Sequence, residues 1–183
     1  MLLPAIVVAA QHPIRPVAGA WRAEVVAGAT VITHDGKAWT AKEGYPLALF
    51  TAPESFGNGT VRMQFKLIDG SDDHTAGLAF GHNGTSYYYV RYNTKDGNVA
   101  LWRMDGPART VIKHGEAHEQ LAKAEWHQLE LTVTGRTVRA TVNGRLRVEH
   151  ELEAPPVGRL GLWTKPDATS AFTVPSVTPA RGR

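Results

Sequence analysis

The sequence predicts an all-β protein folded as a two-sheet antiparallel β-sandwich or jelly roll. From about residue 60 onward, apolar and polar residues alternate with a period of two, and turn dipeptides such as Asn-Gly and Asp-Gly separate the alternating runs. No long segment keeps apolar residues at helical spacing, and the one helical candidate, residues 116–125, lacks an apolar stripe. About ten or more strands are expected, and a domain of this size accommodates them in two layers.

The first 20 residues are predicted to be a signal peptide or an N-terminal extension. They open with MLLPAIVVAA, an apolar run about as long as a signal-peptide core but without a basic start, and an ordinary first strand is the alternative. The run is too short to span a bilayer, so no membrane span is expected. The predicted location is extracellular or periplasmic, although the lack of cysteine leaves the compartment open.

The rest of the chain forms one domain by its length and composition. A total of 183 residues with 43% hydrophobic composition can bury one sizeable core. We assign residues 21–178 to a single jelly-roll domain and residues 179–183 to a short basic tail.

The clearest strand is GTVRMQFKLIDG. Its apolar residues alternate with polar ones, as expected for a strand that is buried on one face: Val61, Met63, Phe65 and Leu67. The runs VALWRM and HQLELTVTG repeat this pattern. Residues 136–152 form a hairpin, because Asn143-Gly144 separates two alternating runs and suits a type I′ turn; Leu146 and Val148 are expected to share its inner face.

The stretch SYYYVRYN, residues 86–93, raises the question of where its tyrosines point. If Val90 faces the core, Tyr88 and Tyr92 face it too, and the residues between them turn outward. The same alternation in VALWRM and GRLGLWTK turns one tryptophan outward in each strand. The predicted outer surface therefore holds Tyr87, Tyr89, Arg91, Trp102 and Trp163, with Gln64 adjoining.

Exposed aromatic rings flanked by hydrogen-bonding side chains are typical of a sugar site. The rings stack on the pyranose C–H face and the polar groups bind hydroxyls, so we predict that these six residues bind carbohydrate, with Arg91 and Gln64 as the hydrogen-bonding members. The alternative is structural: a loop or a segment such as AWRAEVV could cover the rings.

Two acidic stretches contain carboxylates of the kind that bind metals or catalyse hydrolysis. DGSDDH places Asp69, Asp72 and Asp73 in one loop, a set of oxygen donors that suits Ca²⁺ but consists equally of ordinary turn formers. VEHELEA places Glu149, Glu151 and Glu153 on one side of a strand. This resembles a glycosidase carboxylate pair, but a solvated strand edge is favoured.

The remaining composition argues against several functions. Lys and Arg form no long run, so no nucleic-acid partner is expected from a net charge of +3. The sequence contains no nucleophile elbow, phosphate loop or dinucleotide fingerprint, and its eight histidines form no metal-binding pair at helical spacing. The oligomeric state is left open.

The succession of strands resembles the concanavalin A-like lectin/glucanase superfamily, especially its laminin-G-like members and the bacterial 3-keto-disaccharide hydrolase-like group. The resemblance spans about residues 21–178. Its most characteristic parts are Trp126 before LELTV, the hairpin Val142–Gly144, the strand Gly158–Trp163, and the following Asp167 and Phe172.

The resemblance implies a jelly roll whose concave face, in many relatives, holds carbohydrate. The Glu-x-Asp-x-Glu strand of the family 16 glucanases is absent, and DGSDDH does not match the lectin calcium loop. The leading hypothesis is a non-catalytic carbohydrate-binding domain. The alternatives are a hydrolase of glycosides or keto-sugars and a structural or protein-interaction module of the laminin-G type.

Overall fold

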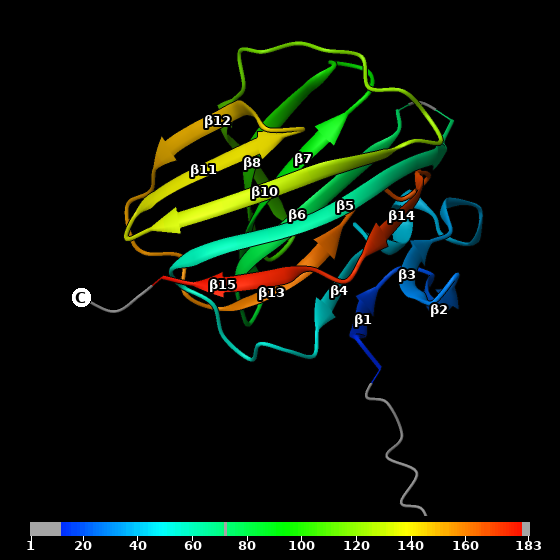
Figure 1. The fold of residues 1–183 in the computed structure, drawn as a ribbon, viewed down its shortest axis with the longest axis horizontal. Coiled ribbons are helices and arrows are strands. Elements are labelled where there is room, and N and C mark those ends of the chain that lie inside the picture. Colours follow the sequence, from blue (N-terminus) through cyan, green and yellow to red (C-terminus); the bar gives the residue numbers. More distant parts are fainter. Residues whose placement is uncertain (1–11, 72, 181–183) are drawn as a thin grey trace, which may run out of the picture.

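The structure, a computed structural model, describes residues 12–71 and 73–180, and these fold into two antiparallel sheets that lie face to face (Figure 1). The predicted two-sheet sandwich is confirmed. Sheet A contains, in spatial order, β1 (Ile14–Ala18), β4 (Leu47–Phe50), β13 (Arg159–Trp163), β6 (Thr75–Asn83), β7 (Ser86–Asn93), β8 (Asn98–Asp105) and β9 (Ala108–His114).

Sheet B is the sheet nearer the viewer in Figure 1. It contains, in spatial order, β12 (Arg145–Glu151), β11 (Thr137–Val142), β10 (Trp126–Thr134), β5 (Gly59–Asp69), β14 (Thr169–Thr173), β3 (Ala29–His34) and β2 (Trp21–Val26), and β15 (Ser176–Pro179) also pairs with β5. Two 3₁₀ turns, η1 (Gly36–Ala38) and η2 (Ala41–Glu43), precede β4. In the described part of the chain, no helix has the length and apolar character needed to cross a membrane.

The main core lies between the two sheets. The apolar residues of β5 point into it as predicted: Val61, Met63, Phe65 and Leu67. Phe65 stacks on Tyr92 of the facing sheet, with the ring centroids 6.3 Å apart. Burial of a large apolar side chain in such a core contributes about 1.5–3 kcal/mol, so these strands hold the two layers together.

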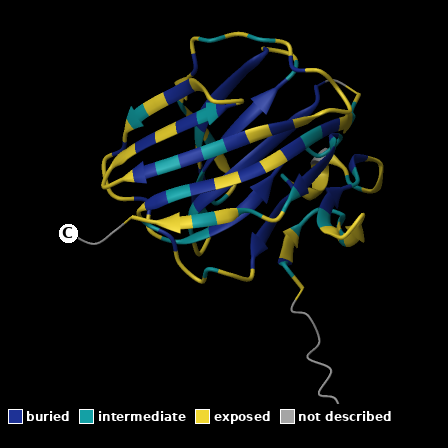
Figure 2. Cartoon of the chain, in the orientation of Figure 1, coloured by how far each residue is buried: buried dark blue, intermediate teal, exposed yellow. Residues whose placement is uncertain are grey.

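The two sheets differ in how far they are buried. In sheet B, buried and exposed residues alternate along β5 and β10, which gives the striped strands in Figure 2. In sheet A, every residue of β4 is buried, and so are the first six residues of β6. Sheet A is therefore covered on both faces over its central strands.

The predicted hairpin at residues 136–152 is confirmed, with one local difference. β11 and β12 pair antiparallel, and Asn143 and Gly144 have φ angles of 51° and 76°, as a type I′ turn requires. Leu146, however, is exposed instead of sharing the inner face with Val148. The register shifts between Ala140 and Thr141, and this β-bulge reverses the direction of Leu146.

The structure describes part of the predicted N-terminal extension and part of the predicted basic tail. β1 lies within the segment assigned to a leader or extension, yet it pairs with β4 in sheet A. Residues 1–11, which include most of the apolar run, and residues 181–183 of the basic tail lie outside the described residues. Residues 116–125 contain no helix, in line with the missing apolar stripe.

The turn residue Asn143 offers a test of the hairpin. Its side chain accepts a hydrogen bond from the backbone N–H of Gln128 at 2.9 Å and contacts Nδ1 of His127 at 3.2 Å. Asn143→Ala should lower the free energy of unfolding by about 1–3 kcal/mol in urea denaturation, because it removes these bonds and places alanine at positive φ. Asn143→Gly loses the same side-chain bonds but should lower the free energy of unfolding by less, because glycine adopts a positive φ without strain. Equal losses in the two variants would contradict this account.

Candidate functional site

An aromatic cluster lies on the outer face of sheet A, the face turned away from sheet B. It contains the four rings that the alternation predicted to point outward: Tyr87, Tyr89, Trp102 and Trp163. The intervening residues point the other way, since Val90 and Tyr92 belong to the core between the sheets and Tyr88 packs against it. The predicted orientation of SYYYVRYN is confirmed.

The rings of the aromatic cluster stack on one another. The centroids of Trp163 and Tyr89 are 4.1 Å apart with an interplanar angle of 18°, and those of Tyr89 and Trp102 are 6.3 Å apart at 8°. Trp163 reaches Tyr89 across β6 because the small residue Ala79 lies opposite Tyr89 in that strand. The ring faces are therefore turned toward neighbouring rings, which differs from the open platform expected from the sequence.

Two further side chains cover the cluster. Nε of Arg109, in β9, donates to Oη of Tyr89 at 2.7 Å, and its Nη1 donates to Oη of Tyr45 at 2.8 Å. The guanidinium carbon of Arg109 lies 3.9 Å from the ring centroid of Trp102, and the Tyr45 ring stacks on Trp163 at 5.3 Å. As a result Tyr89 and Trp163 are 0% exposed and Trp102 is half-buried.

The cover comes from other segments than the sequence suggested. The stretch AWRAEVV forms β2 at the edge of sheet B and does not lie over the cluster. Arg109 is not among the predicted site residues. It follows Asp105-Gly106, one of the Asp-Gly turn dipeptides, and the hairpin of β8 and β9 around that turn places it opposite Met104 on the outer face. Tyr45 precedes β4 in a segment without alternation, so no sequence pattern pointed to it.

Arg91 is the buried cation of this face. Its side chain is 4% exposed, and its Nη2 contacts Oδ2 of Asp96 at 3.4 Å. Its Nε and Nη1 have no hydrogen-bond partner among the described residues, and neither does Nε1 of Trp102. Burial lowers the pKa of Arg91 below its usual range. Buried donors without partners are uncommon in folded proteins and are often found at functional sites.

A polar group continues the outer face beyond Arg91. Oδ2 of the buried Asp73 accepts a hydrogen bond from Nδ2 of Asn93 at 3.0 Å and forms an ion pair with Lys165. Asn93 follows Arg91 by two positions in β7, and Lys165 follows Trp163 by two positions just beyond β13. Within the described chain, Oδ1 of Asp73 has no partner.

Two hollows open on this face on either side of Tyr45. One, of about 480 Å³, is lined by Trp39, Tyr45, Lys165 and Asp167 together with Ser71 and Thr40. The other, of about 400 Å³, is lined by Tyr45, Tyr87, Met104 and His82 among others. Tyr45 therefore forms a ridge between two hollows that adjoin the aromatic cluster.

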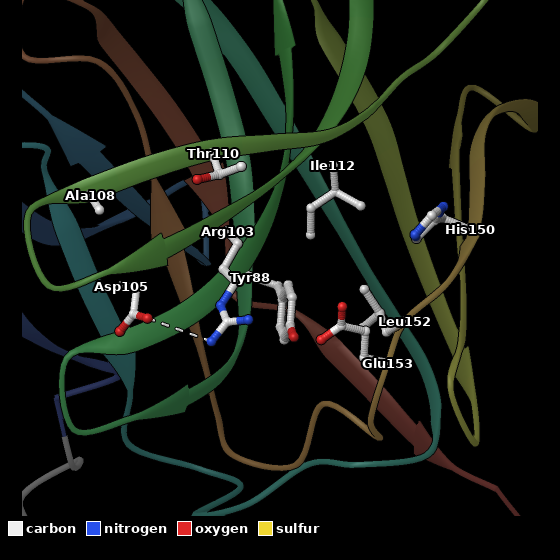
Figure 3. A pocket seen from close by; sticks show the side chains of 9 residues that line it. All are labelled: Tyr88, Arg103, Asp105, Ala108, Thr110, Ile112, His150, Leu152 and Glu153. Atoms are coloured by element: carbon white, nitrogen blue, oxygen red, sulfur yellow. Dashed lines mark ion pairs between the residues drawn. The ribbon is translucent and has the colours of Figure 1, made fainter.

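A further hollow of about 390 Å³ lies at the edge of the sandwich (Figure 3). Tyr88 and Arg103 stand in its centre, with Asp105 on one side and Glu153 on the other. Arg103 forms an ion pair with Asp105 at 3.6 Å. Of the three glutamates in VEHELEA, only Glu153 lines this hollow. Glu149 and Glu151 lie in the edge strand β12 and pair with Arg139 and Arg136.

The structure does not bring Gln64 to the predicted site. Gln64 lies in β5 and is exposed on the outer face of sheet B, because its position has the opposite phase to the buried Phe65. Alternation within β5 gives the outward direction of Gln64, but the sheet to which β5 belongs depends on its pairing with β10 and β14.

In the predicted calcium loop, Asp69 and Asp73 form ion pairs with two different lysines. Asp69 pairs with Lys37 at 3.0 Å, and this partner lowers the Asp69 pKa. Asp73 pairs with Lys165, while Asp72 lies outside the described residues. Among the residues that the structure describes, no group of three or more metal-ligating side chains is found.

Comparison with solved structures defines the class of fold. The carbohydrate-binding module CBM66 from Bacillus subtilis superposes with a TM-score of 0.72 at 20% identity, covering 91% of this chain and 94% of that chain. A protein of unknown function with a galectin-like fold, also from Bacillus subtilis, gives 0.65 at 13% identity with 93% and 90% covered. The Bacillus licheniformis β-glucanase gives 0.55 at 10%, with 92% of each chain covered. The fold is the concanavalin A-like jelly roll.

The sequence comparison then identifies the family. Residues 15–172 match the 3-keto-alpha-glucoside-1,2-lyase-like domain, and the chain belongs to that family. No curated protein matches the chain. The resemblance inferred from the strand succession is confirmed.

The burial of the cluster predicts how its tyrosines titrate. Burial raises the pKa of Tyr87 to about 12 and raises the pKa of Tyr89 as well. At about pH 11 the unfolded chain has ionised its tyrosines, whereas Tyr87 and Tyr89 stay neutral in the folded chain. This contribution to stability is complete below about pH 10 and is lost as the pH rises through the folded-state values.

Absorbance near 295 nm measures this titration. Tyr87→Phe should leave the folded-state signal at about pH 11 unchanged and reduce the signal of the urea-unfolded chain at the same pH. A drop in the folded-state signal would show that Tyr87 ionises with an ordinary pKa.

Proposed function

We propose that the chain binds carbohydrate on the outer face of sheet A, in the hollows beside Tyr45. The observation that carries the proposal is the combination of buried N–H groups without partners, on Arg91 and Trp102, with aromatic rings on one face. Sugar hydroxyls and ring oxygens are acceptors for such donors, and aromatic side chains pack against the apolar faces of sugars. The names of the similar structures, a carbohydrate-binding module and a β-glucanase, support the same ligand class.

The accessible rings, in this proposal, are those at the rim of the site. Trp39 and Tyr45 line the larger hollow and offer the first stacking surface, while the aromatic cluster supports them as a rigid floor. Lys165 and Asp167, with Ser71 and Thr40, supply charged and hydroxyl groups around the same hollow. Movement of the Tyr45 and Arg109 side chains would admit a sugar deeper toward Trp102.

A glycan array followed by isothermal titration tests this proposal. Tyr45→Ala and Trp39→Ala should each weaken binding by about tenfold or more, as expected for a ring at the centre of a site. Trp126→Ala is the matched control, because Trp126 is an exposed tryptophan on the outer face of sheet B, near Gln64. An array without any bound glycan, or equal losses in all three variants, would count against the proposal.

The second candidate function is the elimination named in the family description, a lyase reaction across C1 and C2 of a 3-keto-glucoside. The ketone acidifies the C2–H bond, so a base can take that proton while the C1–O bond breaks and the aglycone leaves with the electron pair. Asp73 and Lys165 favour this candidate: Oδ1 of Asp73 is a carboxylate oxygen without a described partner, and the Lys165 ammonium could stabilise the enolate oxygen.

Release of 4-nitrophenol from 4-nitrophenyl 3-keto-α-glucoside distinguishes catalysis from binding alone. If the chain is a lyase, the wild type releases the phenol, and Asp73→Asn reduces the rate by about 100-fold or more. Asp69→Asn is the control, since Asp69 pairs with Lys37 outside the hollow beside Lys165. Failure of the wild type to exceed the buffer rate would exclude this reaction on this substrate and leave the binding proposal unaffected.

A further inference from the structure

Arg91 holds hydrogen-bonding capacity that its protein neighbours do not use. Its neighbours across the sheet on the same face are Gly77 and Ala100, whose small size leaves the guanidinium without flanking polar side chains. The only carboxylate that the structure places in contact with it, within the described residues, is Asp96 at 3.4 Å. Asp96 itself is 43% exposed, so this ion pair is weakened by solvent.

A second guanidinium contacts the same tryptophan ring as the first. The guanidinium carbons of Arg91 and Arg109 lie 5.6 Å and 3.9 Å from the centroid of the same ring, that of Trp102. The hydrogen bonds that Arg109 makes in the described chain go to the hydroxyl groups of Tyr45 and Tyr89, and no carboxylate contacts it there. The charge of Arg109 adds to burial in lowering the pKa of Arg91.

The nearby charges do not cancel this pair. Lys165 is matched by Asp73, so that cation and that carboxylate offset one another. Asp96 contacts Arg91 and is partly exposed, and the charge of Asp73 also acts on Arg91, so the three cations Arg91, Arg109 and Lys165 face these two carboxylates. In such a site an added anion gains more from the two cations than it would on an open surface.

We propose that the bound sugar is acidic: a uronic acid whose carboxylate is held by Arg91 and Arg109. The proposal rests on the carbohydrate-binding function proposed above. Guanidinium groups match the planar geometry of a carboxylate, and the ligand carboxylate would compete with Asp96 for Arg91. The sugar ring would extend past Arg109 toward Tyr45, which Arg109 contacts and which borders both hollows.

The experiment compares acids with their neutral esters. Oligosaccharides of galacturonic and glucuronic acid are presented beside their methyl esters and beside neutral glucans, and the best pair is measured by isothermal titration. The free acid should bind at least about tenfold more tightly than its ester at low salt, and added NaCl should reduce the difference. Equal affinity of acid and ester overturns the proposal.

Variants with opposite expected effects separate a binding role from a structural one. Arg109→Gln should weaken acid binding by about tenfold and remove the preference for the acid over the ester. Asp96→Asn should strengthen acid binding, since it removes the competing carboxylate, and a purely structural role of the ion pair would not produce this gain. Arg103→Gln should leave binding unchanged, because Arg103 lies in the edge hollow and pairs with Asp105.

The outcomes also separate this proposal from the proposed function. Binding of neutral glucans with no preference for acids overturns the acidic ligand and keeps carbohydrate binding. An absence of binding to every glycan overturns both. Stabilisation by inorganic sulfate or phosphate equal to that by the uronic acids would show a general anion site and overturn the assignment to a sugar acid.

Discussion

The structure depends on one constraint: the central strands of sheet A are apolar on both faces. In a strand, side chains alternate between faces, so an unbroken apolar run such as β4 requires cover on each side. Sheet B covers one side and forms the main core. The other side carries the aromatic cluster, and its cover consists of Tyr45 and Arg109.

The chemical nature of this cover gives the outer face of sheet A its character. An apolar loop would have completed a second core, but Tyr45 and Arg109 bury their flat faces against the rings, while Arg109 hydrogen-bonds to the hydroxyl groups of Tyr45 and Tyr89. The outer face of sheet B has no comparable cluster in the described residues; Arg62 there pairs with Glu130 across β5 and β10.

Buried donors without partners on this face lower the stability of the fold. A buried donor without a partner costs about 1–3 kcal/mol, and Arg91 alone has two such nitrogens. A fold tolerates this cost when the rest of the structure holds the group in place, and here Trp102 and Asp96 contact the guanidinium of Arg91. These unpaired donors are the observation on which the proposed carbohydrate site rests.

The sequence by itself determined the strands, the hairpin at Asn143-Gly144 and the outward direction of Tyr87 and Tyr89, because these follow from local alternation and turn chemistry. Only the tertiary structure decided which outward residues share a surface. Gln64 points outward as predicted, but its strand belongs to sheet B, because strand order depends on contacts between distant segments. Tyr45 and Arg109 contact the aromatic cluster through tertiary contacts that no local period encodes, and these contacts cover the rings that were predicted to form an open platform.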